Sequence, residues 1–143
     1  MTKTIYIAGP MRGLPENNCP RFNKWAAALR IDGWTVRNPV EIGEEFCAEL
    51  GHPGDDKFLA DNIDPLMERE RLIACSCDAL FLLSGWERSR GARDELREFL
   101  ETAGEIYTES VNLPPPIAQF HSPTAGRAGS AETAEARGET YTG

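Results

Sequence analysis

The amino-acid sequence predicts an α/β fold, a single domain built on a doubly wound parallel sheet of four to five strands. Short runs of β-branched and apolar residues alternate with longer segments in which apolar residues recur at helical spacing. Glycine and proline stand at most boundaries between these segments. With 143 residues, the chain is long enough for one domain and too short for two.

The first half of the chain contains two expected strands. Residues 4–8 (TIYIA) are rich in β-formers, and the Gly-Pro pair that follows them ends the first strand. A helix is expected over residues 20–31, because its apolar residues recur at helical spacing and an Asp-Gly pair follows. Residues 34–36 form the second strand, which ends at Asn38 and the proline after it.

The second half continues the alternation. Residues 40–57 are polar and interrupted by glycine and proline, which predicts a short helix over 42–50 followed by a loop. A helix is expected over 65–75, a buried strand over 78–83, and a helix over 89–103 that stops at Gly104. A short fourth strand over 105–107 completes a β-α-β-α-β-α-β order. Such an order predicts a Rossmann- or flavodoxin-like parallel sheet with helices on both faces.

The character of the chain changes after residue 112. Residues 113–143 contain a proline triplet and much Gly, Ala, Ser, Thr and Glu, with few large apolar side chains. Such a segment buries too little surface to offset its ordering entropy. We therefore expect a domain over 1–112 and a mostly disordered tail over 113–143. A tail that docks on a partner subunit is the alternative.

Composition excludes several classes of function. A net charge of −8 argues against binding to nucleic-acid polymers or acidic membranes, which requires a basic face. No apolar run of 18 residues is present, and the first residues lack a signal-peptide pattern, so a cytoplasmic protein is expected. Cys19, Cys47, Cys75 and Cys77 match no zinc-site spacing. Reduced thiols are expected, with no metal and no cofactor.

Polar residues follow three of the expected strands. These are residues 9–13, Asn38 and residues 84–91. Ligands of open parallel sheets bind beyond the carboxyl ends of the strands, where these residues lie. Residues 84–91 also lead into a helix N-terminus, whose unpaired amides attract anions. The sequence therefore predicts a ligand site at this edge of the sheet.

One glutamate of the helix over 89–103 is singled out by its angular position. At about 100° per residue, the apolar stripe of this helix consists of Ala92, Leu96, Phe99, Leu100 and Ala103. The acidic residues expected in solvent are Asp94, Glu98 and Glu101. Glu95 lies at the stripe's edge and is expected to point along the end of the sheet, as a candidate nucleophile or base. The alternative is a glutamate in a salt bridge with Arg88 or Arg12.

Two segments resemble a known superfamily. "IYIAGPMRG" (5–13) and "CDALFLLSGWERSRGARDE" (77–95) are similar to the nucleoside 2-deoxyribosyltransferase superfamily, in particular to a little-characterised branch frequent in bacteriophages and bacteria. They also resemble the 2'-deoxynucleoside 5'-phosphate N-hydrolases. The resemblance covers about residues 3–107, and these two motifs are its specific part.

The motifs match residue by residue. The Tyr-x-x-Gly-x-x-Arg-Gly motif of the hydrolases is matched by Tyr6, Gly9, Arg12 and Gly13. In the second motif a serine precedes the nucleophilic glutamate by six residues, with a glycine between them, and Ser89, Gly91 and Glu95 match this pattern. An acidic helper lies eight residues before the aspartate that opens the third strand. Here that position is Glu70, where the family has aspartate.

The resemblance implies cleavage or transfer of the N-glycosidic bond of a small-molecule nucleotide or nucleoside. It implies Glu95 as the nucleophile that traps the sugar as a glycosyl ester. Glu70 would hold or protonate the leaving base or orient the sugar, and Tyr6 would hydrogen-bond the sugar or Glu95. The groups implied to hold a 5'-phosphate are Arg12, Ser89 and the amides of Met11 and Gly91. The resemblance also implies a homodimer or larger homo-oligomer.

Several of these residues have a simpler interpretation. Gly9-Pro10 is also typical of a plain turn, and Arg12 of a surface cation. Ser89 is also a suitable helix N-cap, and Asn38 a suitable residue for ending the second strand. Trp86 is either a platform for base stacking or a packed lid. At the level of function, the alternative to catalysis is a protein that binds or sequesters a nucleotide-derived molecule, for which Glu95 is dispensable.

Overall fold

The computed structural model describes residues 3–52 and 54–117. Its sheet has four parallel strands in the order β2-β1-β3-β4. The strands are β1 (Thr4–Ala8), β2 (Thr35–Arg37), β3 (Ala79–Leu82) and β4 (Glu105–Thr108). The predicted α/β doubly wound fold is therefore confirmed, and the strand bounds differ from the expected ones by about one residue.

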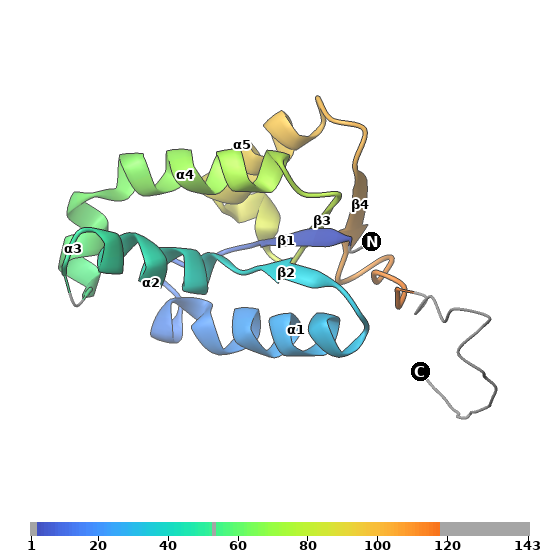
Figure 1. Cartoon of the computed structure of the whole chain (residues 1–143), viewed down its shortest axis with the longest axis horizontal. Helices are drawn as coiled ribbons and strands as arrows, with labels where there is room; N and C mark the ends of the chain where they lie inside the picture. Colours follow the sequence, from blue (N-terminus) through green and yellow to red (C-terminus); the bar gives the residue numbers. More distant parts are fainter. Residues whose placement is uncertain (1–2, 53, 118–143) are drawn as a thin grey trace, which may run out of the picture.

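Helices cover both faces of this sheet. They are α1 (Cys19–Ile31), α2 (Pro39–Glu49), α3 (Asp56–Asp61), α4 (Ile63–Cys75) and α5 (Arg90–Phe99), with the 3₁₀ turns η1 (Pro15–Asn18) and η2 (Trp86–Arg88). Figure 1 shows α1 on one side of the sheet and α4 and α5 on the other. Helix α2 packs with α4, and Ile42 and Phe46 of α2 belong to the same apolar cluster as Leu66 of α4 and Phe99 of α5.

The two-residue period of the strands divides the core into two layers. Ile5 and Ile7 of β1 point to the α1 side, where they pack with Phe22. Tyr6 and Ala8 point to the opposite side, toward α2, α4 and α5. The register of β1 therefore places Tyr6 in the layer that contains helix α5.

The crossovers change direction between β1 and β3. Helix α1 connects β1 to β2 on one side of β1, whereas the connection through α2 and α4 returns across β1 to β3. Ligand clefts form at such switch points, beyond the carboxyl ends of the strands. Here the segments that follow β1 and β3 lie close together, since a Cβ at Gly9 would lie 2.8 Å from the Cβ of Leu83. Gly9 is required by this approach, not merely by a turn.

Helix bounds differ from the expected ones for local reasons. Helix α2 begins at Pro39, before the expected residue 42, since the Asn38 side chain accepts the Val40 amide and proline suits a first turn. Helix α3 was not predicted, and Asp55 caps it by accepting from the Phe58 amide. Helix α5 ends at Phe99, short of residue 103, in a turn closed by the bond from Thr102 N to Phe99 O (2.9 Å).

Residues 113–117, which were assigned to the expected tail, contact the rest of the domain. The carbonyl of Pro115 accepts a hydrogen bond from the Trp34 indole at 3.0 Å. The amide of Ile117 donates to Asp32 O at 2.8 Å, and its side chain packs against the α1-side cluster. Residues 113–117 therefore dock on the domain through an apolar residue and backbone bonds. The expected disorder of residues 118–143 concerns residues outside the described ranges.

In the described part of the chain, none of the helices is long and apolar enough to cross a membrane.

The contact between Gly9 and Leu83 makes a prediction about stability. Gly9→Ala should lower the free energy of unfolding by about 1–3 kcal/mol in urea denaturation, because the new methyl group forces β1 and β3 apart. Gly43→Ala is the matched control. A Cβ at Gly43 meets nothing within 4 Å inside helix α2, so this change should stabilise the protein by about 0.5–1 kcal/mol. Equal stability of Gly9→Ala and wild type would contradict the packing argument.

Candidate functional site

A buried hydrogen bond joins β1 to α5 at the centre of the site. The phenol of Tyr6 donates to Oε2 of Glu95 at 2.8 Å. Tyr6 is fully buried, and Glu95 is only 6% exposed. Ala92 and Phe99 of the same helix anchor α5 in the core on either side of Glu95. The orientation predicted for Glu95 is therefore correct. Its bond to Tyr6 replaces the alternative of a salt bridge with Arg88 or Arg12.

Burial changes the protonation of this pair and of a second carboxyl group. The pKa of Glu95 is raised to about 8 by burial and by the nearby charge of Glu70, against the opposing effect of the Tyr6 hydrogen bond. The pKa of Glu70 is raised to about 7, also by burial. Burial, followed by the charges of Glu95 and Glu70, holds the pKa of Tyr6 well above its usual value. Near neutral pH both carboxyl groups are therefore harder to ionise than exposed glutamates.

These groups line a cavity of about 1380 Å³ at the carboxyl ends of β1 and β3. Nearly all of the predicted site residues contribute to its wall: Tyr6, Gly9, Pro10, Met11, Arg12, Gly13, Glu70, Ser89, Gly91 and Glu95. The two sequence motifs also touch each other here. A Cβ at Gly85 would lie 3.3 Å from Cγ of Pro10, and the φ of +92° at Gly85 suits glycine.

Two arginines in the cavity wall, one from each motif, carry positive charge that no ion pair compensates among the described residues. Arg12 and Arg88 are exposed and line the cavity, and neither forms an ion pair with any residue the structure describes. Ser89 lies beside them as the N-cap of α5, where its Oγ accepts the Ala92 amide at 3.1 Å. The N-cap interpretation of Ser89 is thus correct, and its hydroxyl hydrogen is still free to be donated. Cations and a helix N-terminus together favour an anion.

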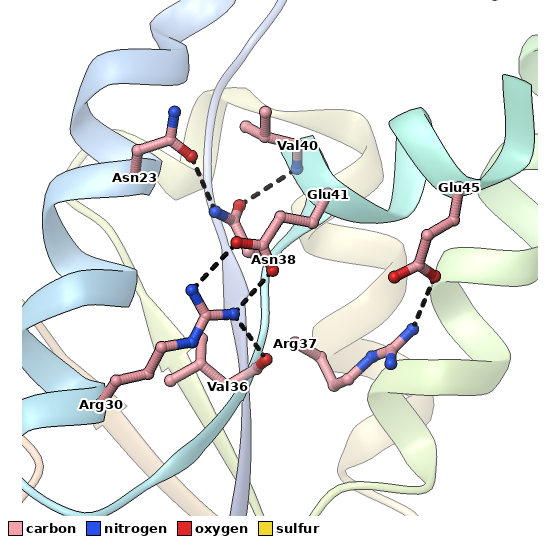
Figure 2. Close-up of polar contacts among 8 residues, drawn as sticks. All are labelled: Asn23, Arg30, Val36, Arg37, Asn38, Val40, Glu41 and Glu45. Atoms are coloured by element: carbon pink, nitrogen blue, oxygen red, sulfur yellow. Dashed lines mark hydrogen bonds and ion pairs between the residues drawn. The ribbon is translucent and has the colours of Figure 1, made fainter. Parts of the chain in front are cut away.

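Asn38 does not line the cavity, and its contacts agree with the alternative of a local structural role at the end of β2. Its side chain is 1% exposed, donates to Oδ1 of Asn23 at 2.9 Å and accepts the Val40 amide at 3.0 Å (Figure 2). Figure 2 also shows Arg30 of α1 bound to Glu41 of α2. The polar groups after β2 therefore fasten α1 and α2 together and position the wall of the cavity.

Trp86 and Asp94 take different positions with respect to the cavity. Trp86 lies in η2 and packs against the apolar cluster beside α5, without lining the cavity, which agrees with the packed alternative. Asp94 lines the cavity and pairs with Arg97 at 3.0 Å, with its side chain 22% exposed. Arginines of its own helix cover it, which an angular argument does not consider. Glu98 and Glu101 are exposed, as predicted.

Sequence reasoning missed the part of the cavity wall that comes from α2, from α4 apart from Glu70, and from the segment between these helices, namely His52, Gly54, Asp55, Leu59 and Ala60. Its polar members include Glu44, His52 and Asp55. The His52 ring stacks on Phe58 with centroids 3.8 Å apart, and its Nδ1 accepts the Gly54 amide at 3.0 Å. A short helix over 42–50 followed by a loop was predicted for residues 40–57, and nothing in their spacing indicates which of them line the cavity that contains Glu95.

The described residues contain no cluster of three or more His, Cys, Asp or Glu side chains arranged to hold a metal ion. The four cysteines are free thiols.

Comparison with known protein families matches residues 3–108 to a domain of unknown function, DUF4406. The match spans all four strands and both motifs, and hence every residue of the cavity wall. No curated protein matches the chain.

The raised pKa of Glu95 predicts how stability depends on pH. Its folded-state value of about 8 exceeds the ordinary 4.5, so the folded protein binds this proton more tightly than the unfolded chain. The resulting stability is complete below about pH 4.5 and is lost as the pH rises through 8. Between pH 5 and 8.5 the wild type should lose about 2–4 kcal/mol of unfolding free energy, and Glu95→Gln clearly less.

Urea denaturation at a series of pH values measures this difference. Glu101→Gln is the matched control, since Glu101 is exposed. The unfolding free energy of this variant should change with pH as steeply as that of the wild type. If the unfolding free energies of Glu95→Gln and the wild type depended equally on pH, Glu95 would be ionised throughout this range.

Proposed function

The chain belongs to the DUF4406 family, and we propose that it cleaves or transfers the N-glycosidic bond of 2'-deoxynucleoside 5'-monophosphates, or of the matching nucleosides. The proposed intermediate is a glycosyl ester on Glu95. The observation that carries the proposal is the buried Tyr6–Glu95 hydrogen bond, in a cavity that also holds Glu70 and Arg12. A carboxylate held in this way, next to a second carboxyl group, suits retaining glycosidic chemistry.

In the proposed reaction the bond between C1' and the base nitrogen breaks, and its electron pair leaves with the base. Glu70 donates a proton to the departing base, a role for which a pKa near 7 is well matched. An oxygen of Glu95 forms the new bond to C1' as the sugar becomes oxocarbenium-like. Water then attacks C1' and the Glu70 carboxylate takes its proton, while the ester bond between C1' and Glu95 breaks and its electron pair returns to the Glu95 carboxylate. An acceptor base in place of water gives transfer.

Glu95 has to be ionised when it attacks C1', and the bound substrate has to favour this ionisation. Burial and the nearby charge of Glu70 raise the pKa of Glu95 to about 8, so the carboxyl proton of Glu95 has to pass to Glu70, which donates it to the departing base. Positive charge that develops at C1' favours the carboxylate, and the Tyr6 hydroxyl donates to the same charge. The low polarity that disfavours the free carboxylate also strengthens its attraction to the transition state.

The choice of a 5'-phosphate is supported by the basic end of the cavity. Arg12 and Arg88 have no carboxylate partners among the described residues, while Ser89 and Gly91 stand at the N-terminus of α5. A monophosphate would compensate these charges. Assembly as a homodimer or larger homo-oligomer stays a prediction from the resemblance.

The second candidate function is binding without turnover of a nucleotide-derived molecule. It is favoured by the protonated state of Glu95 in the free protein. A protonated carboxyl group donates a hydrogen bond, which suits recognition more than nucleophilic attack. Under this alternative, glutamine at position 95 preserves function.

Turnover separates the two candidates. The protein is incubated with a panel of deoxynucleosides and their monophosphates, and free base is quantified by chromatography. Glu95→Gln should reduce base release by at least about a hundredfold while ligand binding persists, because the amide keeps the shape but is a poor nucleophile. Glu101→Gln should behave as wild type. An active Glu95→Gln variant, or a wild type that binds without releasing base, would establish the binding function instead.

The basic end makes a separate prediction about affinity. Deoxynucleoside monophosphates should bind at least about tenfold more tightly than the matching nucleosides, since a charged hydrogen bond contributes about 1.5–3 kcal/mol. Arg12→Ala should remove most of this difference, as measured by calorimetry. Arg97→Ala is the control, because Arg97 pairs with Asp94 and does not line the cavity. Equal affinities in the wild type would indicate a nucleoside site.

A further inference from the structure

We infer that Glu109 is a positioning residue, whose carboxylate holds the β3–α5 loop (residues 83–89) so that Arg88 and the N-terminus of α5 face the cavity. The role assigned to the positioned groups, binding of the anionic part of the substrate, rests on the proposed function. Glu109 itself does not line the cavity.

Glu109 receives donors from two other parts of the fold. It follows β4 directly, and its carboxylate accepts the Ser84 amide at 2.9 Å and the Trp25 indole N–H at 3.1 Å. Arg21 forms an ion pair with the same carboxylate. Burial alone would raise the pKa of Glu109, but the Ser84 amide, Arg21 and Trp25 together lower it, so the group is charged at neutral pH. One carboxylate thus connects β4, helix α1 and the start of the loop.

A displacement of Ser84 would be transmitted along the loop. The next residue, Gly85, has a φ of +92°, and a Cβ there would lie 3.0 Å from Nη2 of Arg88. Backbone bonds from Arg88 N to Gly85 O (3.0 Å) and from Ser89 N to Trp86 O (2.9 Å) make the segment one tight turn. The guanidinium of Arg88 and the N-cap of α5 therefore follow the position of Ser84.

The β3–α5 loop also contacts the segment between β1 and α1, which contains Arg12. Pro10 lies against Gly85 and precedes Arg12 by two residues, so the loop also supports the β1–α1 segment. The Tyr6–Glu95 pair has separate support, since it is held by β1 and by the core residues of α5. Loss of the Glu109 anchor should therefore affect the anion end of the cavity selectively.

The test compares Glu109→Gln with Glu105→Gln. Both residues belong to the β4 segment, but Glu105 pairs with Lys3 at the amino end of the sheet, away from the cavity. In Glu109→Gln one carboxylate oxygen becomes an NH₂ group, which cannot accept from the donors that face it. Trp25→Phe removes only the indole donor and keeps a ring against Phe81, so it serves where Glu109→Gln fails to fold.

Affinity is measured by calorimetry for a deoxynucleoside monophosphate, the matching nucleoside and inorganic pyrophosphate. Glu109→Gln should weaken binding of the monophosphate and of pyrophosphate by at least about fivefold and leave nucleoside binding within about twofold. Trp25→Phe should act in the same direction with a smaller effect. Glu105→Gln should leave all three affinities unchanged.

The outcomes separate this inference from the proposed function. Equal losses for monophosphate and nucleoside, or the same losses in Glu105→Gln, would reduce Glu109 to a stabilising residue and overturn the inference. A wild type that binds neither anion would overturn it as well. Pyrophosphate binding that depends on Glu109, in a protein that neither binds nor cleaves any nucleotide, would support the positioning role and reject the proposed function.

Discussion

The hydrogen bond between Tyr6 and Glu95 is the interaction on which the site depends. It joins the first strand to the last helix across a sequence separation of 89 residues, in a fully buried layer of the core. A buried carboxyl group without a partner is costly, so the phenol both satisfies Glu95 and orients it. Each partner is held by its own element: β1 lies at the centre of the sheet, and α5 is anchored by Ala92 and Phe99.

The electrostatics of the cavity follow from where this pair lies. Removal from water raises the pKa values of Glu95 and Glu70 to about 8 and 7, so both carboxyl groups bind their protons more tightly than exposed glutamates do. Another part of the cavity wall is basic: it contains Arg12 and Arg88, which form no ion pair with the residues that the structure describes. A ligand with an anionic group at one end and a centre that becomes cationic during reaction would match both parts. This physical match, together with the motifs, is the basis of the proposed glycosidic chemistry.

Prediction from the sequence succeeded where a local pattern carries the physical cause. Alternation of β-rich and helical segments determined the sheet, and helical spacing identified Glu95 as the acidic residue at the edge of the apolar stripe. It failed where another part of the fold decides. Asn38 was expected to meet a substrate, yet Asn23 of α1 and the Val40 amide occupy its side chain. Trp86 packs against the apolar cluster beside α5, and residues 113–117 contact the domain although their composition is that of a tail.

By itself the sequence determined the order of the elements, the carboxyl edge of the sheet as the expected place of a site, and two motifs that supply part of the cavity wall. These features depend on side-chain periodicity and on turn residues, which are local. Only the tertiary structure decided that Tyr6 meets Glu95, that Gly9 lies against Leu83, and that Glu109 reaches the Ser84 amide. These contacts join residues 25 to 89 positions apart or lie across the switch point of the sheet. No local pattern encodes them, because they arise from the register of the strands and the packing of the helices upon them.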